Sequence, residues 1–299
     1  MKKFFIGFFK GLAYLGLYFG IMNLVQGIWA GVKCIPLGVK YAAMGADLMN
    51  PTVFEQYMQD LMQVIAEIAV PSTVVSNVVA IVVVCLIFVG RKQKLTEAFC
   101  LRKFHPGAVL PIVLMGLGFN VLTGMILGSL PEELLNSYEQ ASSALTTDVG
   151  VLTIIATVIM APLAEELFLR GLVYTRMKKG MPVIAAMIIS SVLFGMLHGH
   201  WIWAMYASVF GMLLAWTFER TKSLWACILL HFSYNLCAML QMLIPETAPD
   251  FVGVIVLAVA VVFAAVGLFL FIKVPKAEEP VAETAETAAT VAEEEPETL

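Results

Sequence analysis

Residues 151–173 read VLTIIATVIMAPLAEELFLRGLV, and this stretch indicates the class of fold. A helix that crosses a bilayer needs about 20 mainly apolar residues, and the stretch meets this requirement. It nevertheless contains Glu165, Glu166 and Arg170, although ionisable groups cost several kcal/mol within the hydrocarbon core. A membrane helix therefore holds three charged residues that need a structural or chemical explanation.

The composition of the 299-residue chain is that of an integral membrane protein. Hydrophobic residues make up 60% of it and charged residues 13%, and the mean hydropathy is +0.89. Soluble domains contain about 45–50% apolar and about 25% charged residues. The five cysteines show no metal or redox spacing, so we interpret them as small apolar residues.

Eight apolar stretches are long enough to span the membrane: 11–31, 72–90, 108–129, 151–173, 182–199, 201–218, 224–244 and 251–272. If the amino terminus is inside, only Lys33 and Lys40 of the 18 basic residues fall in outer segments. Cytoplasmic loops carry such an excess of Lys and Arg. We therefore predict an all-α, polytopic transmembrane bundle of about eight spans with both termini cytoplasmic.

The chain divides into a transmembrane bundle over 1–274 and an acidic cytoplasmic tail over 275–299. The tail is of low complexity and nearly free of large apolar residues, which predicts disorder. Within the bundle region, residues 50–70 predict an amphipathic helix that rests on the outer leaflet or packs on the bundle. Asn50 is its expected cap, and one face carries Phe54, Met58, Leu61, Ile65 and Ile68.

Helical spacing separates the roles of the charged residues in the fourth span. Glu166 and Arg170 are four residues apart, so they share a face and can pair. Glu165 is turned by about 100° from Glu166 in a helix of 3.6 residues per turn. Pro162 removes a backbone donor just upstream and can kink the helix. One acid is therefore neutralised while the other faces a different surface.

Two further pairs of polar or aromatic residues follow in the next spans. Phe194 and His198 are four residues apart, as are His231 and Asn235. The three pieces EELFLR, FGMLH and HFSYN resemble, in this order, the EExxxR, FxxxH and HxxxN motifs of the CAAX protease and bacteriocin-processing family, also called Abi proteins. Each motif matches without departure, and the resemblance covers about residues 150–240, which we take as the catalytic core.

This resemblance implies an intramembrane endopeptidase with a catalytic cavity in a helical bundle. By position, Glu165 is the general base that activates water, and His198 assists that water or its proton. His231 and Asn235 steady the oxyanion, while Glu166, Arg170 and Phe194 hold the site in shape. The chemistry is sensible by itself, because donors held in a low dielectric stabilise a developing oxyanion better than water does.

Several alternatives stay open at this point. Two histidines and a glutamate are a known zinc set, but no HExxH motif is present, so we expect no cofactor, with zinc as the alternative. The expected partners are the lipid bilayer and a membrane-associated or prenylated peptide or protein substrate, and no nucleic acid. The second function is a bacteriocin-immunity or scaffold protein without catalysis, and the third is a proton-coupled transporter.

Distances along the predicted helices place the two histidines at different depths. His198 lies about 28 Å along its helix from Lys179, whereas His231 lies about 14 Å from Lys222, at 1.5 Å per residue. For the two to meet, the fifth span must be displaced, or residues 199–201 must turn inside the bundle. Cleavage is expected near the cytoplasmic half of what we interpret as a bacterial plasma membrane.

Overall fold

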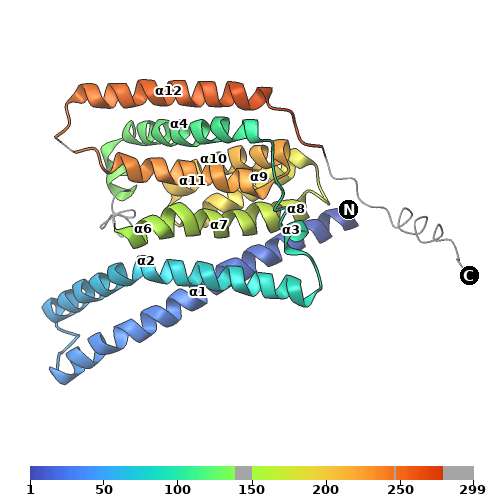
Figure 1. Ribbon diagram of the computed structural model, residues 1–299. Coiled ribbons are helices and arrows are strands. Elements are labelled where there is room, and N and C mark those ends of the chain that lie inside the picture. Colours follow the sequence, from blue (N-terminus) through green and yellow to red (C-terminus); the bar gives the residue numbers. More distant parts are fainter. Residues whose placement is uncertain (139–149, 246, 279–299) are drawn as a thin grey trace, which may run out of the picture.

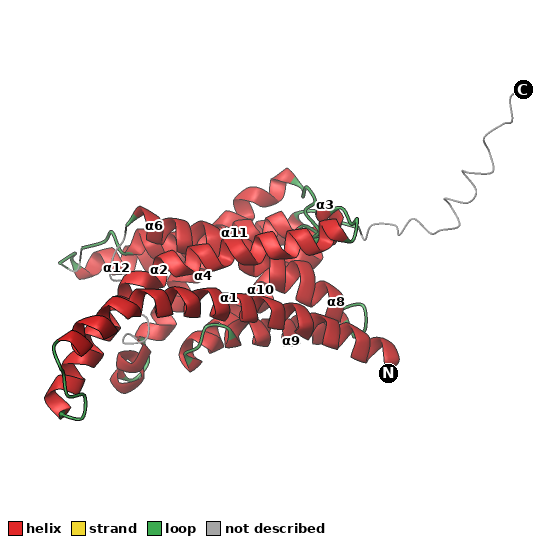
Figure 2. Cartoon of the chain, turned by 90° about the horizontal axis from the view of Figure 1, so that it is seen from below, coloured by secondary structure: helices red, strands yellow, loops and turns green. Residues whose placement is uncertain are grey.

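The computed structural model describes residues 1–138, 150–245 and 247–278, and their regular structure is entirely helical, as predicted (Figures 1 and 2). Its elements are α1 (Lys2–Ala43), α2 (Pro51–Gly90), α3 (Leu95–Ala98), η1 (Pro106–Ala108), α4 (Val109–Gly128), α6 (Val151–Ile154), η2 (Ile155–Met160), α7 (Ala161–Glu166), η3 (Leu167–Tyr174), α8 (Thr175–Met177), α9 (Val183–Met196), α10 (Trp201–Thr221), α11 (Leu224–Gln241) and α12 (Asp250–Lys273). The segments from α6 to α8 follow one another without a break. Residues 132–138 are also helical.

The chain is a membrane protein, since seven of the described helices are long and apolar enough to cross a bilayer. The fifth predicted span, 182–199, is instead the shorter helix α9 of 14 residues, about 21 Å long. A turn at 197–200 then leads into α10, and Gly199 adopts a positive φ of 77° there, a conformation that favours glycine. Because α9 is short, its carboxyl end stops inside the bundle, which brings His198 to the depth of His231.

Helices α1 and α2 form a long hairpin that diverges from the rest of the bundle (Figure 1). With 42 and 40 residues they are about 60 Å long, twice the thickness of the hydrocarbon core. At the tip, Lys40 pairs with Asp60 at 2.8 Å, and the rings of Tyr41 and Tyr57 meet edge to face. The tip is therefore held by polar and aromatic contacts between the two helices.

The prediction of a distinct amphipathic helix over 50–70 was wrong in one respect. These residues form the first half of α2, which continues through Pro71 into the second span. Asn50 caps it as expected, accepting from the Thr52 amide at 3.0 Å. Phe54 and Met58 of the predicted apolar face are exposed, because α2 packs on α1 through a neighbouring face.

Small residues allow α4 to approach α11 and α12 closely. A Cβ atom on Gly118 would lie 2.5 Å from the Ala264 amide nitrogen of α12, and one on Gly116 would lie 2.6 Å from the Ser233 Cβ of α11. Gly267 of α12 has an equally close approach to the Met115 amide nitrogen of α4. This is the small-residue packing that membrane helices use.

We therefore expect Gly118→Ala to destabilise the protein by about 1–3 kcal/mol, because the added methyl group meets helix backbone that cannot move aside. Unfolding of the detergent-solubilised protein measures the change. Gly128→Ala on the same helix is the control, since its Cβ would meet nothing within 4 Å. Equal stabilities of the two variants would show that α12 is not packed on α4 in this way.

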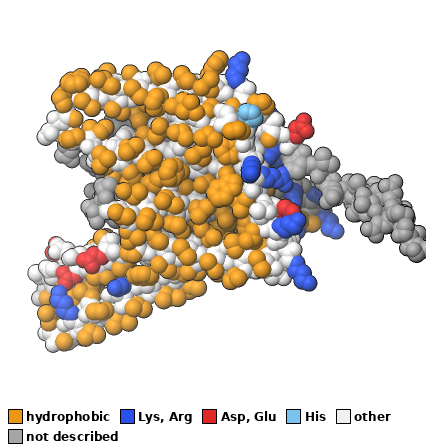
Figure 3. Space-filling view, in the orientation of Figure 1, with side chains coloured by type: hydrophobic (Ala, Val, Ile, Leu, Met, Phe, Trp, Pro, Cys, Tyr) orange, Lys and Arg blue, Asp and Glu red, His pale blue; other side chains and the backbone are white. Residues whose placement is uncertain are grey.

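Most of the basic residues collect at the end of the molecule where the amino terminus and the last described residues lie (Figures 1 and 3). At this end Glu219 accepts hydrogen bonds from Lys178 and Tyr174 at 2.7 Å and from Lys222 at 2.5 Å. The Arg220 side chain donates to the carbonyl of Val274 at 2.9 Å, and the Arg220 backbone carbonyl accepts from the Ala277 amide at 2.8 Å. Ala277 thus contacts the bundle, and the predicted tail beyond residue 278 lies outside the described residues.

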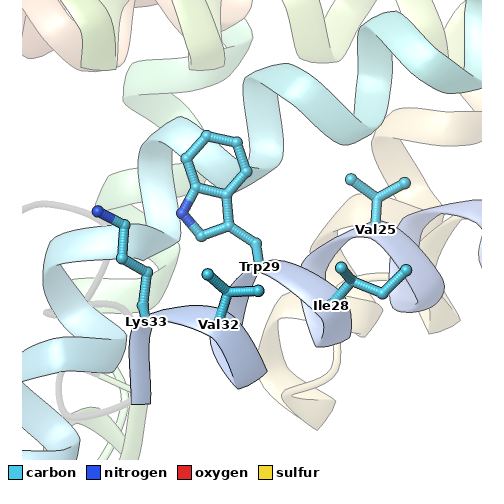
Figure 4. Close-up of a pocket in the computed structure, with 5 residues that line it drawn as sticks. All are labelled: Val25, Ile28, Trp29, Val32 and Lys33. Atoms are coloured by element: carbon cyan, nitrogen blue, oxygen red, sulfur yellow. The ribbon is translucent and has the colours of Figure 1, made fainter. Parts of the chain in front are cut away.

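A separate apolar hollow of about 500 Å³ lies along α1 (Figure 4). Val25, Ile28 and Val32 line it with Trp29, whose ring points toward α2, and Lys33 is its charged member. It shares no lining residue with the cavity described next.

Candidate active site

The helix that carries the paired glutamates has two widened, π-helical segments. Glu165 and Glu166 end the short α-helical piece α7, between π-helical η2 and η3. Pro162 stands at the start of α7 and has no amide proton to donate to the preceding turn. Single π-helical turns occur within α-helices frequently at functional sites, where they re-aim side chains. The local kink expected from Pro162 takes this form.

The Glu166–Arg170 pair expected from the spacing is present and buried. Arg170 Nη1 lies 2.9 Å from Glu166 Oε1, and the exposed fractions of the two side chains are 1% and 0%. Arg170 Nη2 donates to the Gly211 carbonyl at 3.1 Å, and its guanidinium lies over the Phe194 ring at 4.4 Å. The arginine therefore ties the glutamate helix to α9 and α10.

His231 of α11 lies between the two glutamates. Its Nδ1 is 2.8 Å from Glu166 Oε1, the same oxygen that Arg170 contacts, and its Nε2 is 3.9 Å from Glu165 Oε2. With Nδ1 bonded to the buried acid, Nε2 is the ring atom directed to Glu165. Glu165 differs from its neighbour in that 19% of its side chain is exposed. The two acids thus occupy the different surfaces that the helical spacing predicted.

His198 follows the end of α9 and joins the same group of side chains. Its Nδ1 lies 3.0 Å from the Phe194 carbonyl, and its ring packs on the Phe194 ring at 4.9 Å. Phe194 also meets the His231 ring edge to face at 5.8 Å. The phenylalanine therefore braces both imidazoles, whereas the sequence had suggested contact with His198 alone.

Asn235 lies one turn beyond His231 but bonds elsewhere. Its Nδ2 donates to the backbone carbonyl of Thr157 at 2.8 Å, across to the π-helical segment η2. In the described structure the Asn235 side chain makes no hydrogen bond to the His231 ring. The bond to Thr157 fixes the orientation of the amide toward the cavity that both residues line.

Glu165, His198, His231 and Asn235 all line one cavity of about 570 Å³. Its further polar and aromatic lining residues come from α2, α4, α10, α11 and the helical residues 132–138: Thr73, Asn120, Thr123, Tyr138, Trp203, Tyr206, Tyr234 and Gln241. The volume is that of an ordinary small-ligand pocket or of a few peptide residues. The sequence analysis did not identify these further lining residues. Asn120 and Gln241 could have indicated them, because they are uncharged polar residues within predicted membrane spans.

The expectation of no cofactor, with zinc as the alternative, stays a prediction. Catalytic zinc is held by three protein ligands. Among the described residues, no group of three or more His, Cys, Asp or Glu side chains that could hold a metal ion is found. Glu166 contacts both Arg170 and His231.

The segment that carries the three motifs is similar to known proteins. Residues 147–237 match the family model of Rce1-like type II CAAX prenyl endopeptidases, and this range contains all three motifs. This segment is similar to the Rce1-like family. The match confirms the resemblance drawn from the three motifs.

One curated relative is named "Putative membrane peptidase YdiL" and comes from Bacillus subtilis (strain 168). It is 29% identical over 94 residues, which are 31% of this chain and 38% of the relative. The chain thus aligns with less than half of the relative's length. No solved structure matches the chain significantly.

Proposed function

We propose that the protein is an intramembrane endopeptidase that hydrolyses a peptide bond of a membrane-associated peptide with a water molecule activated by Glu165. The observation that carries this proposal is the cavity in which the partly exposed Glu165 carboxylate faces His231 Nε2 at 3.9 Å. The Rce1-like match over 147–237 supports the reaction class. The bacterial relative, named as a putative membrane peptidase, supports a membrane location.

In this reaction Glu165 takes a proton from water, and the hydroxide oxygen bonds to the carbonyl carbon of the peptide. The carbonyl oxygen becomes an oxyanion in a tetrahedral intermediate. The proton held by Glu165 then passes to the amide nitrogen, directly or through His198, and the C–N bond breaks to release an amine and a carboxylic acid, whose proton then passes to the amine or to solvent. A positioned acid or base contributes about 10²–10⁴-fold to such a rate.

His231 and Asn235 are the groups that would stabilise the oxyanion. In the form that has a proton on both ring nitrogens, His231 donates from Nδ1 to Glu166, whose carboxylate balances the positive charge, and from Nε2 into the cavity. The Asn235 amide donates one N–H to Thr157 and has a second N–H to offer. Donors fixed before the reaction stabilise developing charge without reorganisation.

We expect Asn235→Ala to lower kcat by about 10²–10³-fold, the loss typical of removing one oxyanion donor. Steady-state kinetics in detergent would measure kcat and KM, and KM should change little. Asn23→Ala is the matched control, because Asn23 makes the same kind of bond to the Phe19 carbonyl on an exposed face of α1. If both variants kept full kcat, Asn235 would only connect helices.

The proposal is tested by exposing the purified protein in lipid nanodiscs to a peptide library, beside its Glu165→Gln variant, with and without chelator. Cleavage that is lost in the variant and survives chelation supports the proposed water activation. Cleavage that is lost with chelator and restored by zinc would overturn the metal-free reaction. Equal cleavage by both proteins would remove Glu165 from the mechanism.

A further inference from the structure

We infer that the substrate peptide reaches Glu165 from the extracytoplasmic side of the membrane, through a passage between α4 and α11. The inference rests on the proposed function for the identity of the ligand as a peptide. Access from this side differs from the expected cleavage near the cytoplasmic half of the bilayer. The substrate must then be present on the extracytoplasmic side, and residues of α4 and α11 line its path.

The cavity lies in one half of the bundle, as its position along each helix shows. In α4 the lining residues Asn120 and Leu127 fall in the carboxyl-terminal half, and in α10 Trp203 and Phe210 fall in the amino-terminal half. These two helices run in opposite directions, so both observations place the cavity in the same half of the bundle. That half is opposite to the end where the basic residues collect (Figure 3).

The basic end of the bundle is closed beneath the site. From Leu167 to Tyr174, every side chain on the cytoplasmic side of the glutamates is buried, and Leu169 and Leu172 have no exposed surface. On α11, Leu224 and Leu230 are likewise fully buried. Glu165 lies about 18 Å from Met177 at the basic end, and the residues between them from Leu167 to Tyr174 are all buried.

The opposite end of the cavity is open among the described residues. Gly124 on α4 and Met242 just after α11 both line it, and both are exposed, Met242 by 41%. A side chain added at Gly124 would meet nothing within 4 Å. The cavity therefore runs from the catalytic group outward between the carboxyl ends of these two helices.

Two amides at the opening suit a peptide backbone. Gln241 Nε2 donates to Asn120 Oδ1 at 2.6 Å and so joins α11 to α4. In the described part of the chain this leaves Asn120 Nδ2 as a donor and Gln241 Oε1 as an acceptor without another hydrogen-bond partner. Each residue of an extended peptide offers one backbone N–H and one C=O, which can pair with such an acceptor and donor.

The basic residues orient the passage in the membrane. Lys and Arg are enriched in cytoplasmic segments, so the basic end is cytoplasmic and the opening faces outward. A peptide attached to the inner leaflet would meet the closed layer of buried side chains. The fitting substrate class is thus a peptide, or the outer end of a membrane-anchored peptide, exposed on the extracytoplasmic side.

The test measures access without requiring turnover. Glu165→Cys is placed in the full chain in sealed vesicles of known orientation, and a membrane-impermeant trimethylammonium methanethiosulfonate is added outside. Modification of this position is read by peptide mass spectrometry, which separates it from the five native cysteines. We expect rapid modification in right-side-out vesicles and none in inside-out vesicles. Modification from the cytoplasmic side, from both sides or from neither would overturn the inference.

Matched variants keep the result interpretable. Adding Gly124→Phe should slow modification about tenfold, because the ring fills the passage, whereas Gly128→Phe one turn along should leave it unchanged. Lys179→Cys should react from the cytoplasmic side alone, which checks the vesicle orientation. The proposed function fails separately, through undiminished cleavage by Glu165→Gln in detergent, where no side of the membrane is distinguished.

Discussion

Replacing Glu165 by glutamine is expected to lower kcat by about 10²–10⁴-fold, the contribution of a positioned general base. Glutamine has nearly the same size, but its amide does not take a proton from water. Because 19% of the Glu165 side chain is exposed to the cavity, the substitution leaves no buried charge unpaired. The unfolding stability and KM should therefore stay close to those of the unmodified protein, and the loss should fall on kcat.

The same substitution at the neighbouring Glu166 provides the comparison for Glu165→Gln. Glu166 is fully buried and contacts both Arg170 and His231, so Glu166→Gln should reduce stability and activity together. An exposed acid, Glu97, provides the neutral control through Glu97→Gln. A kcat within threefold of the parent for Glu165→Gln would show that another group activates the water, and a matching loss of folded protein would assign Glu165 a structural role.

The sequence was sufficient for contacts that lie within one helix. Glu166 and Arg170 pair because residues four apart meet on a helix face whatever the tertiary structure is. Phe194 likewise meets His198, which lies in the turn directly after α9. The helical class and the membrane location follow equally from long apolar stretches. These predictions need no knowledge of which helices are neighbours.

Contacts between helices could not be predicted in the same way. His231 meets Glu166 across 65 residues of chain, and Asn235 meets Thr157 across 78, and both depend on how α11 packs against the glutamate helix. The two π-helical segments also change the direction of side chains from that of a regular helix. The amphipathic pattern of 50–70 did not reveal that α2 is continuous, since Pro71 sits within a helix that its long neighbour α1 supports.

The largest loss of stability is expected from Arg170→Met, at about 3–5 kcal/mol. The substitution removes the cation and leaves the Glu166 carboxylate buried with His231 as its remaining partner. Glu166 Oε2 already lacks a hydrogen-bond partner among the described residues, so the acid has no other compensation. The bond to the Gly211 carbonyl and the contact with the Phe194 ring are lost as well.

Unfolding of the purified protein in detergent measures this effect, with Lys94→Met as the control. Lys94 and its partner Glu97 are both well exposed, and such surface pairs contribute little. The double variant Glu166→Gln with Arg170→Met should recover part of the stability, because it no longer buries an unpaired charge. If Arg170→Met were as stable as Lys94→Met, Glu166 would be neutral in the folded protein. The ion pair would then not be the support that holds His231 toward Glu165.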